Sequence, residues 1–89
     1  MHAARDMASF VSDITPDEAS RGFARMDDPV VGTMVVAPVG NGIFAVKLVT
    51  DDGAVRYQIC DERGTPLYAA ARSLAELELR FGLSDLKTA

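Results

Sequence analysis

Hydrophobic and polar residues alternate along the second half of the chain, in runs that are separated by turn sequences. One run covers residues 43–49 and the next covers residues 55–60, with Asp-Gly at positions 52–53 between them. Asp-Gly favours a two-residue hairpin turn, because both residues accept a left-handed backbone conformation. Gly-Asn-Gly at 40–42 precedes the first run, and Arg-Gly at 63–64 follows the second. The pattern predicts an antiparallel β-meander.

Two shorter runs extend this meander at its ends. Residues 30–38 are rich in valine and apolar on both faces, which is typical of a strand that is covered on both sides. Residues 65–69 form a short strand that Pro66 restricts to an edge of the sheet, because proline has no backbone N–H to donate. We therefore expect a meander of three to four strands.

A helix is predicted after the strands. Ser73 opens a Ser-x-x-Glu capping box, and apolar residues recur on one helical face as far as Phe81. Leu79 lies nearly opposite this apolar stripe. We expect the helix to pack on one face of the sheet, and Leu79 to be covered by a neighbouring element or by another chain.

The first 29 residues are predicted to be helical. Apolar residues from position 3 to position 14 recur at three- and four-residue spacing, which indicates one helix. Thr15 and Glu18 form a capping box with Pro16 at the first helical position, which predicts a second helix. This helix is expected to end at Asp28, because a residue before proline is pushed out of the helical region.

The 89 residues are thus expected to form one α+β domain, residues 1–89. Residues 1–29 would form two N-terminal helices that carry the acidic excess. Residues 30–89 would form the three- to four-stranded antiparallel meander and a C-terminal helix packed on one face of it.

Both faces of the predicted sheet are apolar. If Phe44 packs under the C-terminal helix together with Tyr57, then Ile43 and Val49 lie on the opposite face. Either the N-terminal helices cover that second face or two sheets meet in a homodimer, since a large exposed apolar patch is a liability. We expect a homodimer that associates through Ile43, Val49 or Leu79.

The charge of the chain narrows the choice of partners. The formal net charge is −4, and the first 28 residues carry most of the acidic excess. Direct binding to nucleic acid needs clustered lysine and arginine, which this chain lacks, so no direct nucleic-acid ligand is expected. An acidic segment favours a basic protein partner instead. The residues predicted to bind that partner are Asp13, Asp17, Glu18, Asp27 and Asp28.

The sequence lacks the motifs of common catalytic and metal sites. Its single histidine, His2, lies at the chain terminus, where a catalytic triad or metal site would have no stable framework. The carboxylate pairs at 51–52 and 61–62 could attract a cation, but they fit hairpin turns better. Cys60 is predicted to be a buried packing residue. We expect no enzymatic activity, no cofactor and no metal.

No segment approaches the roughly 20 apolar residues of a membrane span, so a cytoplasmic protein without a membrane partner is expected. The sequence therefore predicts a non-enzymatic, acidic protein–protein interaction module that forms a homodimer. An alternative is an inhibitor or antidote, encoded by a phage or mobile element, that blocks a basic nucleic-acid-handling enzyme or complex. A small-ligand binder is the weakest of the three hypotheses, because no convergent polar set is visible.

Overall fold

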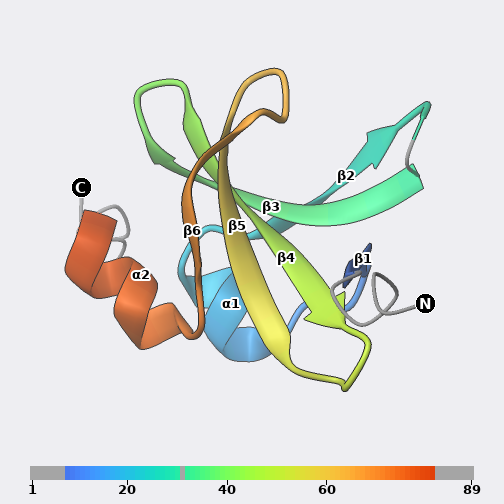
Figure 1. Ribbon diagram of the computed structural model, residues 1–89, viewed down its shortest axis with the longest axis horizontal. Coiled ribbons are helices and arrows are strands. Elements are labelled where there is room, and N and C mark those ends of the chain that lie inside the picture. The colour runs from blue at the N-terminus through green and yellow to red at the C-terminus, as the bar shows by residue number, and fades with distance from the viewer. Residues whose placement is uncertain (1–7, 31, 82–89) are drawn as a thin grey trace.

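The computed structural model describes residues 8–30 and 32–81, which form a six-stranded antiparallel sheet and two short helices (Figure 1). The strands are β1 (Ala8–Phe10), β2 (Ala24–Asp28), β3 (Gly32–Gly40), β4 (Ile43–Thr50), β5 (Val55–Asp61) and β6 (Pro66–Ala71). The helices are α1 (Pro16–Ser20) and α2 (Leu74–Phe81).

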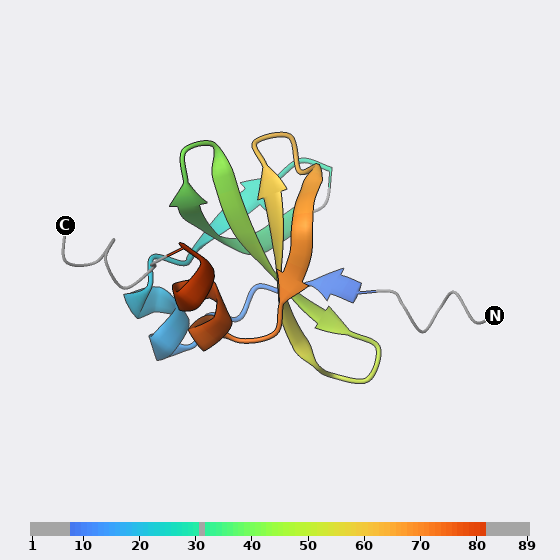
Figure 2. The same ribbon diagram turned by 60° about the vertical axis from the view of Figure 1, so that its left-hand side comes forward.

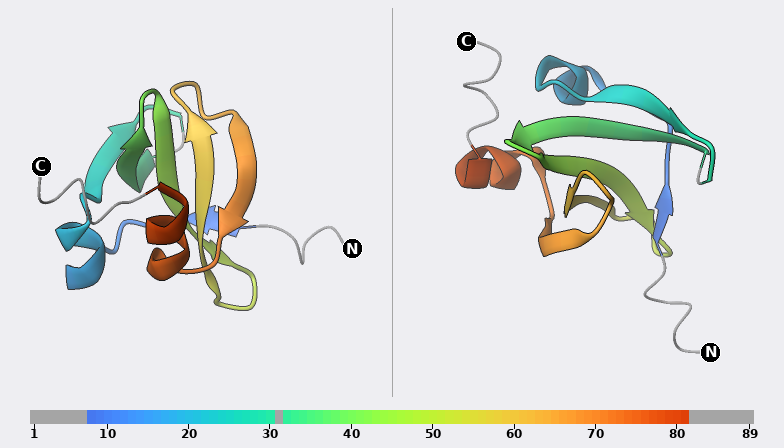
Figure 3. Two further views of the ribbon diagram at one scale, coloured as in Figure 1. Left: turned by 90° about the vertical axis from the view of Figure 1, so that its left-hand side faces the viewer. Right: turned by 90° about the horizontal axis from the view of Figure 1, so that it is seen from above.

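Strand β4 is the centre of the sheet. The strand order is β2-β3-β4-β5-β6, with β1 also paired to β4. β5 follows one side of β4 from Ile43 to Val49. On the other side, the first half of β4 pairs with β3, and the second half, from Leu48 to Thr50, pairs with β1. The hairpin of β2 and β3 diverges from β4 where β1 takes its place, so the sheet is strongly curled (Figure 3).

The prediction of two helices in the N-terminal third of the chain is wrong. Residues 8–10 are strand β1, residues 24–28 are strand β2, and only the five residues of α1 are helical between them. The rest of the predicted first helix, before residue 8, lies outside the described residues. A short helix is marginal by itself, whereas β2 gains a full antiparallel ladder with β3, so tertiary pairing outweighs the helical spacing.

The capping box that begins α1 is confirmed. The Thr15 hydroxyl accepts a hydrogen bond from the Glu18 N–H at 3.1 Å, and the Glu18 carboxylate accepts one from the Thr15 N–H at 2.9 Å. The helix ends early because Gly22 follows with a φ of 97°, in the left-handed region that glycine adopts at little cost. A capping box therefore located the start of this helix but carried no information about its length.

Strands β3 to β6 lie at the four runs predicted to be strands, but they belong to a larger sheet, and the expected assignment of its faces is wrong. In the β4–β5 pair, Phe44 lies opposite Cys60, and Lys47 lies opposite Tyr57. Directly opposite residues of an antiparallel pair point to the same face. Phe44 and Tyr57 therefore lie on opposite faces, and Ile43 shares the face of Tyr57. Alternation gives the period within each strand, while the turn sets the phase between strands.

The main core lies between the sheet and the two helices, which sit side by side at one end of it (Figure 2). An ion pair between Arg21 after α1 and Glu78 on α2 joins them. The buried members of the main core are Phe23, Val35, Ala37, Val39, Ala45, Tyr57, Ile59, Ala71 and Leu77. The helices thus cover one face of the sheet and leave the other face for a separate cluster.

Leu77→Ala should lower the free energy of unfolding by about 2–5 kcal/mol, because it removes fully buried methyl groups and leaves a cavity. Leu79→Ala is the matched control, since the same truncation occurs on the same helix at a side chain that is 88% exposed. We expect this control to cost less than about 0.5 kcal/mol. Urea titrations measure both values, and equal losses would contradict the buried position of Leu77.

Candidate functional site

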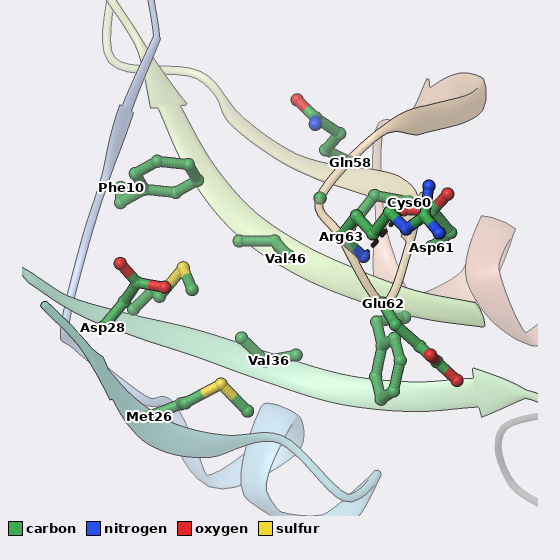
Figure 4. A pocket seen from close by; sticks show the side chains of 13 residues that line it. Phe10, Met26, Asp28, Val36, Val46, Gln58, Cys60, Asp61, Glu62 and Arg63 are labelled. Carbon is green, nitrogen blue, oxygen red and sulfur yellow. Dashed lines mark hydrogen bonds between the residues drawn. The ribbon is translucent and has the colours of Figure 1, made fainter. Parts of the chain in front are cut away.

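A groove of about 390 Å³ lies on the face of the sheet that the helices do not cover (Figure 4). Its floor is a small buried cluster contributed by β3, β4 and β5, namely Val36, Val46 and Cys60. Phe10 on β1 and Met26 on β2 line one side, and the turn between β5 and β6, residues 61–64, lines the other. Because the sheet curls, five strands contribute side chains to one cavity.

The register of the strands makes the floor continuous. Val36 of β3 lies opposite Val46 of β4, and Met26 of β2 lies opposite Met34 of β3, so each pair shares a face. The two apolar faces of β3 therefore have different structural roles. One face fills the core beneath the helices, and the other forms the floor of the groove.

The rim of the groove is acidic. Asp28, Asp61 and Glu62 line it, and Arg63 is the single base among the lining residues. The Asp61 carboxylate accepts hydrogen bonds from the backbone N–H groups of Thr65 and Arg63, each at 2.9 Å. These bonds, first the one from Thr65, hold the pKa of Asp61 below its usual range. Asp61 is therefore charged at neutral pH while it also shapes the turn.

The thiol on the floor of the groove is buried. Cys60 is buried, and burial, followed by the negative charge of Asp61, raises the pKa of its thiol. The thiolate is the nucleophilic form of cysteine, so a raised pKa suppresses nucleophilic and redox chemistry. Cys60 acts here as a small packing residue, in agreement with the sequence-based interpretation.

A second cluster of ionisable side chains lies inside the core. Glu18 is 2% exposed and Lys47 is 5% exposed, and Tyr57 is also buried. Glu18 accepts hydrogen bonds from the Lys47 ammonium at 2.9 Å and from the Tyr57 hydroxyl at 2.6 Å. Lys47 also donates to the backbone carbonyl of Asp13 at 2.9 Å. Within the described part of the chain, every buried side-chain nitrogen and oxygen has a partner. This network holds α1 on the sheet.

Opposing effects set the charge states of this network. Burial, the largest influence on Glu18, favours its neutral form, but hydrogen bonds from Tyr57, the Thr15 backbone and Lys47 outweigh it together. The pKa of Glu18 therefore falls below its usual 4.5. Burial and then the bond to Glu18 raise the pKa of Tyr57. At neutral pH Glu18 is therefore a carboxylate and Tyr57 is a neutral phenol.

The five acids predicted to bind a partner are spread over the fold. Glu18 belongs to the buried network, whereas Asp13 and Asp17 are exposed beside and on α1. Asp27 and Asp28 lie at the far end of β2, which runs away from α1 (Figure 1). The structure brings only Asp28 of this set to the groove.

The residues predicted for self-association are also separated. Ile43 is half-buried and packs against the main core, and Val49 is half-buried opposite Val55. Leu79 is exposed on α2. Of these three side chains, Leu79 alone is fully presented at the surface.

In the hairpin turns, the carboxylates of Asp52 and Asp61 accept hydrogen bonds from nearby residues of the same turn. Asp52 accepts hydrogen bonds from the Thr50 hydroxyl and from the Ala54 N–H, and in the next turn Asp61 accepts them from the Arg63 and Thr65 N–H groups. Within residues 8–30 and 32–81, no group of three or more histidine, cysteine or acidic side chains could hold a metal ion. None of the helices in that part of the chain is long and apolar enough to cross a membrane.

Sequence reasoning missed two parts of these sites. Lys47 was not singled out from the sequence, although a lysine within an apolar run indicates a buried charge once a carboxylate such as Glu18 can reach it. Phe10 and Met26 were missed as groove residues because both were assigned to helices. Their signal was weak, since β1 contains only three residues and β2 contains five.

Comparison with known proteins finds no matching family model, curated protein or solved structure.

Lys47→Met should lower the free energy of unfolding by about 3–5 kcal/mol, because it leaves the Glu18 carboxylate buried without its cation. Adding Glu18→Gln should recover part of this loss, since a neutral amide is cheaper to bury than an unpaired charge. Chemical denaturation of the single and double variants measures the difference. A double variant that is no more stable than Lys47→Met would contradict this account of the ion pair.

The network also predicts how stability depends on pH. The pKa of Glu18 is lower in the folded chain than its usual 4.5, so its contribution to stability is present above that pH and is lost as pH falls through the folded pKa. The stability difference between the wild type and Glu18→Gln should therefore shrink on acidification. Denaturant titrations from neutral pH to about pH 3 measure it, and a constant difference would contradict the lowered pKa.

Proposed function

We propose that this protein is a non-enzymatic protein-interaction module whose groove binds an apolar segment of a partner protein flanked by lysine or arginine. The observation that carries the proposal is an apolar floor beneath an acidic rim, open to solvent. Phe10 is 40% exposed and Met26 is 47% exposed at this site, so apolar surface remains available to a partner.

The chemistry of the groove favours protein side chains over a small polar ligand. A site for a small polar molecule needs several convergent hydrogen-bonding groups, and the floor here consists of aliphatic carbon and a protonated thiol. Met26 and Met34 add flexible, polarisable side chains, which adapt to partners of different shape. Such a surface suits aromatic or aliphatic anchors of a polypeptide.

The acidic rim determines which charge the partner segment should carry. Three carboxylates and one guanidinium line the groove, and the whole chain carries a net charge of −4. Complementary charge around an apolar contact accelerates association and rejects acidic competitors. The partner segment is therefore basic on both sides of its apolar anchor.

The same proposal includes two further points: the protein has no enzymatic activity, and it is located in the cytoplasm. Every buried polar atom of Glu18, Lys47 and Tyr57 has a partner inside the fold, and burial raises the pKa of the Cys60 thiol. A free buried thiol suits a reducing compartment. These side chains stabilise the fold, and the groove provides the binding surface.

A random-peptide display library panned against the full chain should enrich peptides with an aromatic or large aliphatic residue next to lysine or arginine. Phe10→Ser should weaken binding of an enriched peptide at least about tenfold, because aromatic anchors dominate interface energies. Leu79→Ser is the matched control, an exposed apolar residue outside the groove, and should leave affinity unchanged. Fluorescence titration measures both, and a loss confined to Leu79→Ser would move the binding surface to α2.

Charge reversal at the rim should act mainly on the rate of association. Glu62 is exposed on the β5–β6 turn, and Glu62→Lys should slow association with the enriched peptide and flatten its dependence on salt. Asp51→Lys makes the same charge change in the β4–β5 turn, at the other end of β5. Stopped-flow kinetics at several salt concentrations compare the two, and identical behaviour would contradict steering by the rim.

A further inference from the structure

The two outer strands of the sheet differ in how well their free edges are protected. At β6, Pro66 lacks an N–H group, and the Arg80 guanidinium donates a hydrogen bond to the backbone carbonyl of Ala69 at 2.7 Å. At β2, the described strands provide a partner on one side alone, which is β3. Seen from above, β2 is the outermost strand of the molecule (Figure 3). Its outer edge can therefore accept another strand.

The residues of β2 are complementary to a second copy of themselves. In an antiparallel pair of two β2 strands centred on Met26, each Met26 lies opposite the other. Arg25 then lies opposite Asp27 of the second copy, and two-fold symmetry forms this pair twice. Opposite charges directly across an antiparallel pair stabilise it, whereas like charges destabilise it.

The same charges exclude the neighbouring registers. In an antiparallel pair, residues that lie opposite each other point to the same face of the sheet. The nearest alternative registers of two β2 strands are therefore centred on Arg25 or on Asp27. Centring on Arg25 would place two guanidinium groups opposite each other, and centring on Asp27 would do the same with two carboxylates. Charges on an edge strand usually prevent pairing, but here they select one register.

The side chains of Arg25 and Asp27 are each anchored within their own chain at one atom. Both are exposed and lie on the same face of β2, opposite to Met26. Arg25 Nε donates a hydrogen bond to the carbonyl of Ser12 at 2.8 Å, and Asp27 Oδ1 accepts one from the Thr33 hydroxyl at 2.9 Å. The Nη atoms of Arg25 and Oδ2 of Asp27 take no part in these two bonds.

We propose that two copies of this protein pair through β2, antiparallel and centred on Met26, to form one continuous sheet across a two-fold axis. On the groove face the two Met26 side chains, each 47% exposed, pack against each other. On the other face two pairs of Arg25 and Asp27 flank the axis. This dimer is formed by a strand edge, and it shares the Met26 side chain with the groove.

A charge-swap experiment tests the register. Sedimentation equilibrium of the full chain from micromolar to millimolar concentration should show a dimer. Arg25→Asp and Asp27→Arg should each raise its dissociation constant at least about tenfold, and the two changes together should return it toward the wild-type value. The double variant restores both the opposite charges across the pair and the net charge of the chain, so the net-charge effect is read from Arg72→Asp. Arg72→Asp, an exposed charge change on another part of the fold, should leave the dimer intact.

Disulfide crosslinking tests the centre of the pair. Met26→Cys should form a covalent dimer under mild oxidation, because the two-fold axis brings position 26 of both copies together. Ala24→Cys is the matched control on the same face, and it should not crosslink, since position 24 lies opposite position 28 of the second copy. Native Cys60 is buried in both variants. A wild-type protein of monomer mass throughout, or equal crosslinking of the two variants, would overturn the proposal.

Discussion

The buried carboxylate of Glu18 is the interaction on which the arrangement of this fold depends. It accepts a hydrogen bond from the Thr15 N–H at the start of α1. It also accepts hydrogen bonds from the Lys47 side chain on β4 and from the Tyr57 hydroxyl on β5. An ion pair in a core is tolerated only when every polar atom has a partner, and this network meets that condition. It places α1 on one face of the sheet, and the chain then turns at Gly22 into β2.

Because both helices cover the same face of the sheet, the opposite face is left open to form the groove. β3 and β4 carry apolar side chains on both faces, and α1 and α2 cover one of them. The uncovered face becomes a groove because the sheet curls around it, and the turn after β5 adds an acidic rim. Met26 belongs both to the groove and to the free edge of β2, so partner binding and self-association would take place side by side.

The predictions that succeeded rest on local chemistry. A turn at 52–53, the strands on either side of it, the capping box of Thr15 and the start of α2 after Ser73 each depend on residues close in sequence. The turn is not the predicted two-residue type, because Gly53 has a positive φ and Asp52 does not. The predictions that failed required long-range information. The spacing before residue 29 resembled helices, but β1 and β2 are strands because β4 and β3 provide ladders for them.

The four strands from β3 to β6, the two helix starts and the acidic charge could be predicted from the amino-acid sequence, because turn geometry, capping and ionisation depend on neighbouring residues. The face that each strand presents depends on the folded arrangement, since a two-residue period leaves the phase between strands open. The folded arrangement also decides that Lys47 is buried with Glu18 and that Phe10 and Met26 line one groove. These contacts join distant segments, and their energies arise only when the folded chain brings the segments together.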